Sequence, residues 1–241
     1  MAAERKRVDA ETGYVLHAYA YRETSSIIEV FSRGYGRLPL VARGARRPRS
    51  QFRGVLMEFQ PLELSWFGQG EMPTLTKAEW IGGQPLLAGR ALLFGYYLNE
   101  LLLRLLARED AHPALFDAYR EILGQLAAGA AQAALLRRFE QTLLREIGYG
   151  LTLDHEAEGG TAVRGDRMYA YLIERGPVDL ARVPDAGLVI SGKALLGMAG
   201  NDYSDAQTLQ QSKTLMRALI DHYLGGQTLN SRRIFMELQE L

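Results

Sequence analysis

A change of periodicity near residues 81–86 constrains the fold of this chain more than any other feature. Between residues 13 and 81 the chain consists of short segments rich in aromatic and aliphatic residues, separated by Gly, Pro and Ser. That pattern is typical of β-strands joined by turns. From about residue 86 the apolar residues recur at helical spacing instead. The sequence therefore predicts an α+β protein, with a β module over residues 1–82 and an α-helical domain over residues 83–241.

The β module contains five strand-like runs, which read YVLHAYAYRE, IIEVFSR, RLPLVARG, VLMEFQPLELSWFG and TLTKAEWIGG. Gly34 and Gly36 mark the turn between the second and the third run, and GQGEMP separates the last two. Five short strands with turns at this spacing indicate a small barrel or sandwich. A basic and aromatic surface on such a module favours a five-stranded OB-fold barrel, a common binder of single strands.

The second part of the chain contains several helical segments. Helices are predicted over residues 86–110, 112–129 and 131–148, the first of them apolar nearly all round. A further helix is expected to start at Ser204 with Gln207 completing a capping box, and to stop at Gly225. Asn230 or Ser231 is expected to cap a last short helix. Residues 151–190 stay ambiguous, with a loop expected over HEAEGGTAVRGD.

Composition excludes several classes of protein. The chain of 241 residues contains no cysteine, so a disulfide framework, a thiol nucleophile and a thiolate zinc site are all excluded. The N-terminal residues are basic but lack a following apolar run, so no signal peptide is expected. A membrane span is not expected either, because no uninterrupted run of about 18 apolar residues occurs.

The charges of this formally neutral chain are unevenly distributed. Residues 1–60 hold 11 Lys and Arg against six acids, an excess of +5, so the remainder carries −5. The segment VARGARRPRSQFRG, residues 41–54, is the centre of this asymmetry, and no acid occurs between Val30 and Met57. Its Gly and Pro residues predict a loop. Because Arg binds phosphate bidentately and aromatic rings stack on bases, we predict a nucleic-acid surface. Its residues are Arg33, Tyr35, Arg37, Arg43, Arg46, Arg47, Arg49, Phe52 and Arg53.

Two other motifs suggest chemistry only weakly. GLVISGK, residues 187–193, matches a phosphate-loop pattern, but its centre is strand-like and Ala194 follows Lys193, so no hydroxyl is available for Mg²⁺. A short strand leading into a helix is the preferred interpretation. LDHEAE, residues 153–158, offers acids and one His, but a solvated loop explains it better than a metal site. No nucleophile motif is present, so catalysis is not expected and no cofactor or metal is predicted.

Arg137 and Arg138 form a separate candidate site. They lie outside the apolar arc of the helix over residues 131–148. Cations on the flank of an apolar helix suit an acidic peptide that ends in an apolar residue. Two solvated surface arginines are an equally good interpretation.

Four segments of the chain resemble the bacterial recombination mediator family RecO, in order and at the family's approximate spacing. They are RETSSIIEVFSRGYGRLPLVARGARRPRS (22–50), NELLLRLL (99–106), LRRFEQTLLREIGYGLTLDH (136–155) and HYLGGQTLNSRRIF (222–235). The resemblance covers nearly the whole chain and implies an N-terminal OB-fold followed by an α-helical domain. Some members of the family carry a four-cysteine zinc site after the LTLD region. This chain has HEAEGG there, so no structural zinc is expected.

The resemblance also implies a non-enzymatic function in DNA repair and recombination. Proteins of this family bind single- and double-stranded DNA, anneal complementary strands and bind the acidic C-terminal tail of single-strand binding protein. With RecR, and in some settings RecF, they load the RecA recombinase. By this resemblance the arginines of residues 33–53 map to the DNA surface and Arg137 and Arg138 to the tail pocket. The expected location is the cytoplasm, in association with the nucleoid. An RNA-binding OB-fold protein and a nucleotide hydrolase using Lys193 stay open as alternatives.

Overall fold

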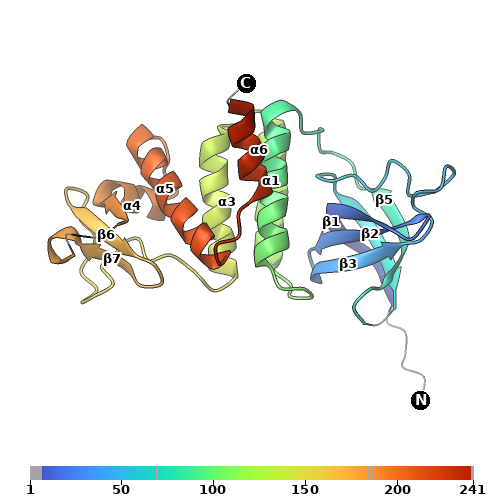
Figure 1. The fold of residues 1–241 in the computed structure, drawn as a ribbon, viewed down its shortest axis with the longest axis horizontal. Coiled ribbons are helices and arrows are strands. Elements are labelled where there is room, and N and C mark those ends of the chain that lie inside the picture. The colour runs from blue at the N-terminus through green and yellow to red at the C-terminus, as the bar shows by residue number, and fades with distance from the viewer. Residues whose placement is uncertain (1–6, 69, 184, 186, 240–241) are drawn as a thin grey trace, which may run out of the picture. The chain divides into compact units, whose positions relative to one another are not determined.

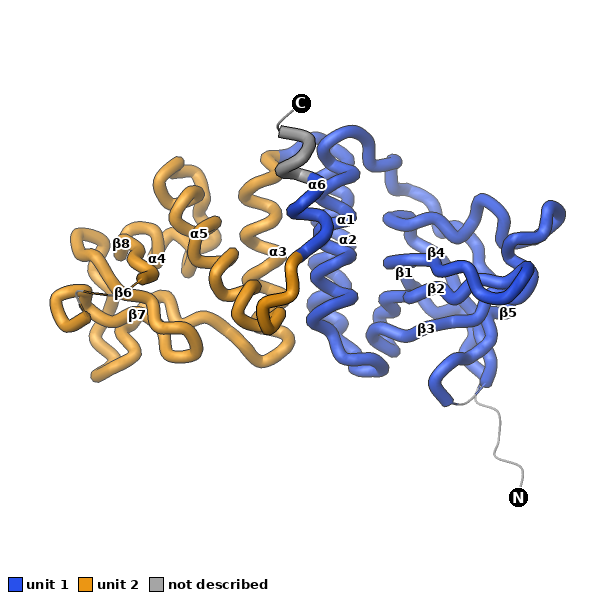
Figure 2. The backbone as a smooth tube through the Cα atoms, in the orientation of Figure 1, with its two compact units in different colours: residues 1–130, 229–241 blue, residues 131–228 orange. Residues whose placement is uncertain are grey.

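In a computed structural model, the chain is described except for residues 1–6, 69, 184, 186 and 240–241 (Figure 1). Arg5 and Lys6, which contribute to the N-terminal positive charge, lie outside the described residues. The chain divides into two compact units, residues 1–130 with 229–241 and residues 131–228 (Figure 2). The predicted boundary at residues 82 and 83 instead separates the barrel from the helices of the first unit.

The first unit contains a closed barrel of five strands in the order β1-β2-β3-β5-β4. The strands are β1 (Arg7–Tyr21), β2 (Ser25–Ser32), β3 (Gly36–Ala42), β4 (Leu62–Phe67) and β5 (Thr74–Trp80). Neighbours are antiparallel except β3 and β5, which pair in parallel at Val41 and Thr74. This confirms the predicted OB-fold barrel. The fourth predicted strand is shorter than expected, because residues 55–61 belong to the loop before β4.

The barrel closes around an apolar interior supplied by alternating residues of every strand. Ile28, Val30, Leu40, Leu62 and Leu64 are all fully buried there. The register of β1 shifts twice, which bends this long strand so that it pairs with both β2 and β4.

Two helices of the first unit pack against the barrel, α1 (Gly89–Leu105) and α2 (Pro113–Ala127). Tyr14 of β1 contacts the rings of Phe116 and Tyr119 of α2, at centroid distances of 5.6 and 5.2 Å. Asn99 of α1 donates a hydrogen bond of 2.9 Å to the Leu16 carbonyl and accepts one from the Tyr119 hydroxyl. Burial raises the pKa of Tyr14 to about 12, so this phenol stays protonated near neutral pH.

The last helix, α6 (Asn230–Gln239), packs on α1 in the same unit. The Glu100 carboxylate of α1 accepts hydrogen bonds from the backbone N–H of Asn230 and of Ser231, at 2.9 and 2.8 Å. It also accepts one from the Ser231 hydroxyl at 2.7 Å. A carboxylate from another helix therefore caps α6.

The second unit contains α3 (Gln132–Glu146), α4 (Gly192–Ala199) and α5 (Ala206–Tyr223). It also contains a sheet in the order β7-β6-β8, formed by β6 (Met168–Leu172), β7 (Gly176–Asp179) and β8 (Val189–Ser191). A short 3₁₀ helix, Leu180–Arg182, follows β7. The sequence does not predict this sheet. Its strands are only three to five residues long, too short for a reliable alternation of apolar residues.

The start of α5 differs from the prediction. Asp205, not Ser204, precedes the helix, and its carboxylate accepts hydrogen bonds of 2.8 Å from both the backbone N–H and the hydroxyl of Thr208. The predicted capping box with Gln207 is therefore wrong. The end of the helix is confirmed, because Leu224 is its C-cap and Gly225 follows with φ of 60°. Within the described ranges, each helix is either too short or too polar to cross a bilayer.

Candidate nucleic-acid interface

Residues 43–54 of the arginine segment form the first part of the loop between β3 and β4, as predicted, whereas residues 41 and 42 end β3. The backbone of the loop turns repeatedly, with the N–H groups of Arg47, Ser50 and Arg53 donating to carbonyls three residues earlier. The N–H of Arg46 donates to the Thr24 carbonyl at 2.9 Å and so ties the loop to the β1–β2 turn. Gly44 adopts φ of 68°, a left-handed conformation that favours glycine.

Apolar residues fix this loop to the barrel. The Phe52 side chain is only 6% exposed and lies in the barrel core, with Ala45, Val55 and Leu56 packed beside it. This burial corrects the prediction that Phe52 is presented to bases. The ring anchors the loop and leaves the neighbouring arginines on the outside.

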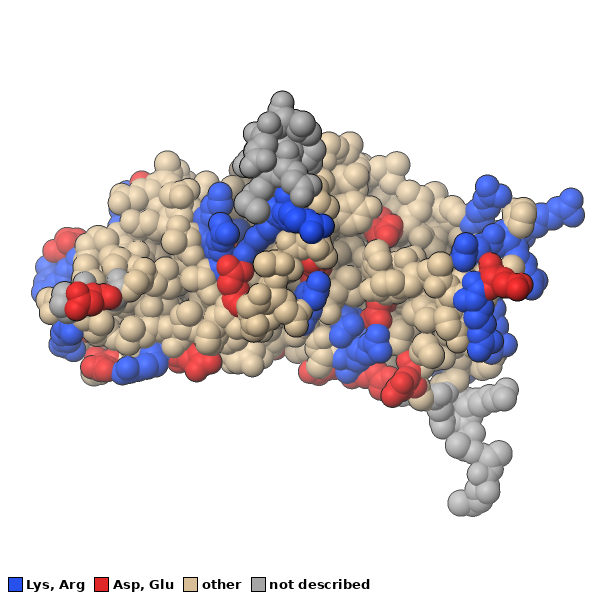
Figure 3. All heavy atoms as spheres, in the orientation of Figure 1, with Lys and Arg blue, Asp and Glu red and all other residues tan. Residues whose placement is uncertain are grey.

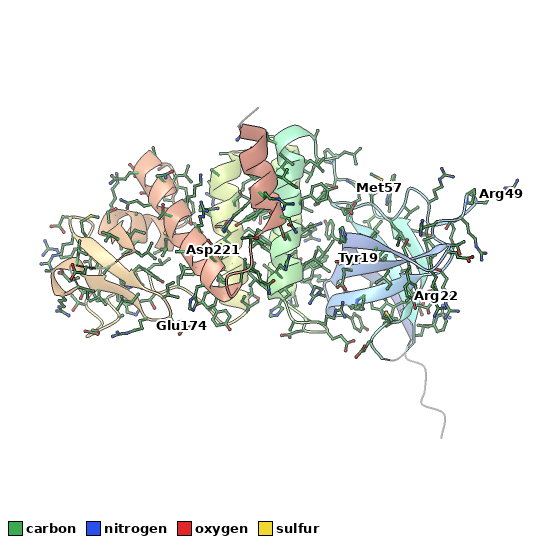
Figure 4. The ribbon with its side chains drawn as sticks, in the orientation of Figure 1. Tyr19, Arg22, Arg49, Met57, Glu174 and Asp221 are labelled. Carbon is green, nitrogen blue, oxygen red and sulfur yellow. The ribbon has the colours of Figure 1, made fainter. Side chains whose placement is uncertain are left out.

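The exposed arginines of the loop lack acidic partners. Arg43, Arg46, Arg47, Arg49 and Arg53 are all exposed. Among the described residues none of them forms an ion pair, and the guanidinium of Arg53 donates to the Pro48 carbonyl at 3.1 Å. Arg49 points away from the barrel at the tip of the loop (Figure 4). On the face drawn in Figure 3, basic side chains gather at this end of the barrel. Uncompensated guanidinium groups of this kind suit phosphate.

Arg33 and Arg37 lie at the opposite end of β3 from this loop, about 20 Å away along a strand that rises about 3.3 Å per residue. Arg33 forms a bidentate pair with Asp117 of α2, with N–O distances of 3.2 and 2.9 Å. The hydrogen bond and charge of Arg33 hold the pKa of Asp117 below its ordinary value. Asp117 also pairs with Arg120 at 3.4 Å, so Arg33 is engaged within the first unit while the three groups keep a net charge of +1.

Arg37 is also engaged within the fold. Its guanidinium donates to Glu29 at 3.0 Å and to the Leu106 carbonyl, and its side chain is only 15% exposed. Arg108 forms a second ion pair with the same carboxylate. This position corrects the prediction that Arg37 belongs to a DNA surface. Tyr35, in the adjacent turn, is half-buried with its ring against Trp66 at 5.2 Å.

A groove of about 460 Å³ opens beside the arginine loop. Three segments line it, namely the β1–β2 turn, the end of β3 with the start of the loop, and the connection between β4 and β5. The lining residues are Tyr21, Arg22, Thr24, Ser25, Val41, Arg43, Gly44, Arg47, Met72 and Thr74. The corresponding turn and connection of OB-folds are those that bind oligonucleotides.

Arg22 is a groove residue that the sequence prediction missed. It lies 21 residues before Arg43, where the arginine loop begins, and Glu23 is beside it, so no local charge pattern singled it out. Its guanidinium carbon lies 5.1 Å from the centroid of the Tyr21 ring, a cation–π contact between two residues that line the groove. The barrel brings together Arg22, Arg43 and Arg47.

In the second unit, Arg137 and Arg138 have different surroundings. Arg137 forms a buried ion pair of 2.5 Å with Glu140, and the two side chains are 10% and 1% exposed. The solvated interpretation is therefore wrong for Arg137. Arg138 is exposed and donates to the Asn201 carbonyl at 3.3 Å, in the turn between α4 and α5. The hydroxyl of Tyr203, in the same turn, accepts a hydrogen bond from the Gln141 side chain, and burial raises the pKa of Tyr203 to about 12.

The remaining candidate motifs have structural partners. Lys193 forms an ion pair of 2.7 Å with Asp205, and Ser191 caps α4, so the preferred interpretation as a strand leading into a helix is confirmed. Asp154 pairs with His155 at 2.7 Å. Glu156 forms an ion pair with Arg182 at 3.8 Å, and Glu158 forms one with Arg175. In the part of the chain that is described, no three carboxylate or imidazole groups converge as metal ligands.

The barrel and its exposed arginine loop define an OB-fold protein with a basic loop face. The family model for the N-terminal part of recombination protein O matches residues 9–84, and that for its C-terminal part matches residues 87–233. The chain therefore belongs to the RecO family of DNA repair proteins.

Curated relatives agree with this assignment. The chain is 59% identical over 240 residues to the DNA repair protein RecO of Aromatoleum aromaticum, covering 99% of this chain and all of the relative. It is 56% identical over 242 residues to the same-named protein of Azoarcus sp., with 99% of this chain and all of the relative covered. The RecO protein of Dechloromonas aromatica is 55% identical over 240 residues, covering 98% of this chain and 99% of the relative.

Proposed function

We propose that this protein is a non-enzymatic recombination mediator that binds single- and double-stranded DNA and anneals complementary strands. One observation carries the proposal, the cluster of five exposed arginines without acidic partners among the described residues. Two of them, Arg43 and Arg47, line a groove together with Arg22. Membership of a DNA repair family supports DNA as the ligand.

The binding we propose is mainly electrostatic. Each phosphate that an arginine neutralises releases condensed counterions, so affinity falls with salt and depends little on sequence. A loop that holds two strands through their phosphates leaves the bases free to pair. This supports annealing without any covalent chemistry.

The partners follow from the resemblance. We propose that the acidic tail of single-strand binding protein binds the second unit beside Arg138, which is the exposed member of the predicted pair. RecR, with RecF in some settings, would then assist loading of RecA. The expected location is the cytoplasm, in association with the nucleoid.

The direct test is DNA affinity after removal of the loop charge. Replacing Arg43, Arg46, Arg47 and Arg49 with Ala should weaken binding of fluorescein-labelled single strands and duplexes, measured by anisotropy. A matched control removes the same charge from exposed positions elsewhere, Arg90, Arg120, Arg145 and Arg217. Equal affinity of the two quadruple variants would contradict the proposed site.

RNA binding is the alternative that the fold leaves open. A preference for RNA requires contacts to the 2′-hydroxyl. Competition between unlabelled DNA and RNA strands of the same sequence distinguishes the two, and stronger competition by RNA would contradict the DNA assignment.

The nucleotide-hydrolase alternative is less well supported, because Lys193 is engaged by Asp205. ATP turnover abolished by Lys193→Ala would revive it.

A further inference from the structure

Trp80, at the end of β5, presents its ring to solvent in a fixed orientation. The residue is 55% exposed, and its indole N–H donates to the Val55 carbonyl at 3.0 Å. The other tryptophan of the chain, Trp66, is 4% exposed and packs in the barrel core. A large exposed ring whose single polar group is already bonded to the backbone has a preset face for a flat ligand.

The arginine loop leads from the groove to this ring. At its start, Arg47 lines the groove together with Thr74, the first residue of β5. Further on, the Gln51 side chain donates to the Thr76 carbonyl at 3.4 Å. The loop then reaches Val55, whose carbonyl binds Trp80. The loop therefore follows β5 over its full length, roughly 20 Å at about 3.3 Å per residue.

Charge around Trp80 is compatible with a nucleic-acid strand. Arg53, two residues before Val55, is exposed and is one of the arginines without an acidic partner among the described residues. The neighbouring acid, Glu79, pairs with Lys77 at 2.9 Å, but the same ammonium also contacts Glu63 at 3.5 Å, so these three groups keep a net charge of −1 and Arg53 is the cation that attracts phosphate here. Phosphates bound along the loop would place a base within reach of the indole.

We infer that Trp80 is a base-stacking platform for unpaired DNA whose phosphates lie along the arginine loop, so that this residue distinguishes single strands from duplexes. The inference rests on the proposed function and names the form of DNA that the site prefers. In a duplex both faces of each base are covered by neighbouring pairs, so an exposed protein ring gains little. In a single strand the face is available, and stacking is tolerant of sequence.

The chain contains two tryptophans, and only Trp80 is exposed enough for a base to stack on it, so the part of the emission that DNA quenches reports on Trp80. Unlabelled oligo(dT) should quench the emission of the wild-type protein, and a duplex of the same length should quench it much less. The quenched component should be absent in Trp80→Phe. Anisotropy with a fluorescein-labelled strand measures affinity independently of this signal.

The affinity of Trp80→Ala for single strands should fall by about fivefold to 150-fold, the range expected for the loss of one base–aromatic stack. Its affinity for duplex should change less than twofold. Circular dichroism establishes that each variant is folded. Strand binding by anisotropy with unchanged emission would overturn the inference and leave the proposed function intact. Equal losses for strand and duplex would overturn it too. A protein that binds neither would overturn the proposed function as well.

Discussion

Arg37 of β3 and Glu29 of β2 form a buried ion pair across two adjacent strands, with an N–O distance of 3.0 Å. Arg108 binds the same carboxylate from the segment after α1, and the Leu106 carbonyl accepts further hydrogen bonds from Arg37. One arginine of the basic N-terminal region thus connects the barrel to the helices of its unit. The positive charge of residues 1–60 serves two purposes, since some arginines hold the fold and others face solvent.

Arg37→Ala should destabilise the protein and leave DNA binding by the folded protein unchanged. Removing one partner of a buried pair costs about 3–5 kcal/mol, and the lower end applies because Arg108 stays beside Glu29. Urea unfolding measures the change in the free energy of unfolding. Arg43→Ala is the control, and as an exposed substitution it should change stability by less than about 0.5 kcal/mol. Similar stability of the two variants would contradict a structural role for Arg37.

The loop arginines are expected to act through their charge and through their planar shape, and the two contributions can be separated. Replacing Arg43, Arg46, Arg47 and Arg49 with Lys keeps the charge but removes bidentate binding. The slope of log affinity against log salt should stay constant, whereas affinity itself should fall. The Ala variants should lower the slope on single strands by about 0.7 for each phosphate that is no longer neutralised. A slope that falls equally in the Lys and Ala variants would contradict this separation, because the Lys variants keep the charge that the slope measures.

Much of this architecture follows from the sequence because the barrel strands and long helices have clear periods. Phe52 and Trp80 show where sequence reasoning fails, since an aromatic residue among arginines and one at the end of a strand give no sign of which is buried. The structure buries Phe52 at 6% exposure and leaves Trp80 at 55%. Asp117, the partner of Arg33, lies 84 residues away along the chain, so that pairing could not be inferred locally. Arg37 binds Glu29 only eight residues away, but also the Leu106 carbonyl at a separation of 69 residues, so its burial against the helices could not be inferred either.

The cap of α5 predicts a pH dependence of stability. The hydrogen bond from Lys193, followed by those from Thr208, lowers the pKa of Asp205 to about 2. Because the folded pKa lies below the ordinary value of about 4, ionised Asp205 stabilises the fold above pH 4, and that contribution is lost as the pH falls towards 2. Asp205→Asn should therefore lower the Tm at pH 7, and its difference from wild type should shrink below pH 4. A difference that is constant from pH 7 to pH 3 would contradict the role of the ionised carboxylate.

Arg137 and Arg138 are expected to respond differently to substitution, which makes the tail-binding proposal testable at Arg138 alone. Arg137→Glu would place a second carboxylate beside buried Glu140, so any loss of binding in that variant would reflect unfolding. Arg138 is exposed, and its hydrogen bond to the Asn201 carbonyl is long at 3.3 Å. Arg138→Glu should weaken binding of an acidic peptide that ends in an apolar residue by about tenfold or more, because it replaces attraction with repulsion.

Arg138→Lys keeps the charge and should retain most of the affinity for the peptide. Isothermal titration calorimetry at two salt concentrations measures both variants, and thermal unfolding establishes that their stability is unchanged. Arg145→Glu, another exposed arginine on α3, is the matched control for the charge reversal. If Arg138→Glu and Arg145→Glu weaken the peptide equally, the effect is long-range electrostatics and the tail does not bind beside Arg138. If only Arg138→Glu weakens it, the peptide carboxylates lie at the turn between α4 and α5.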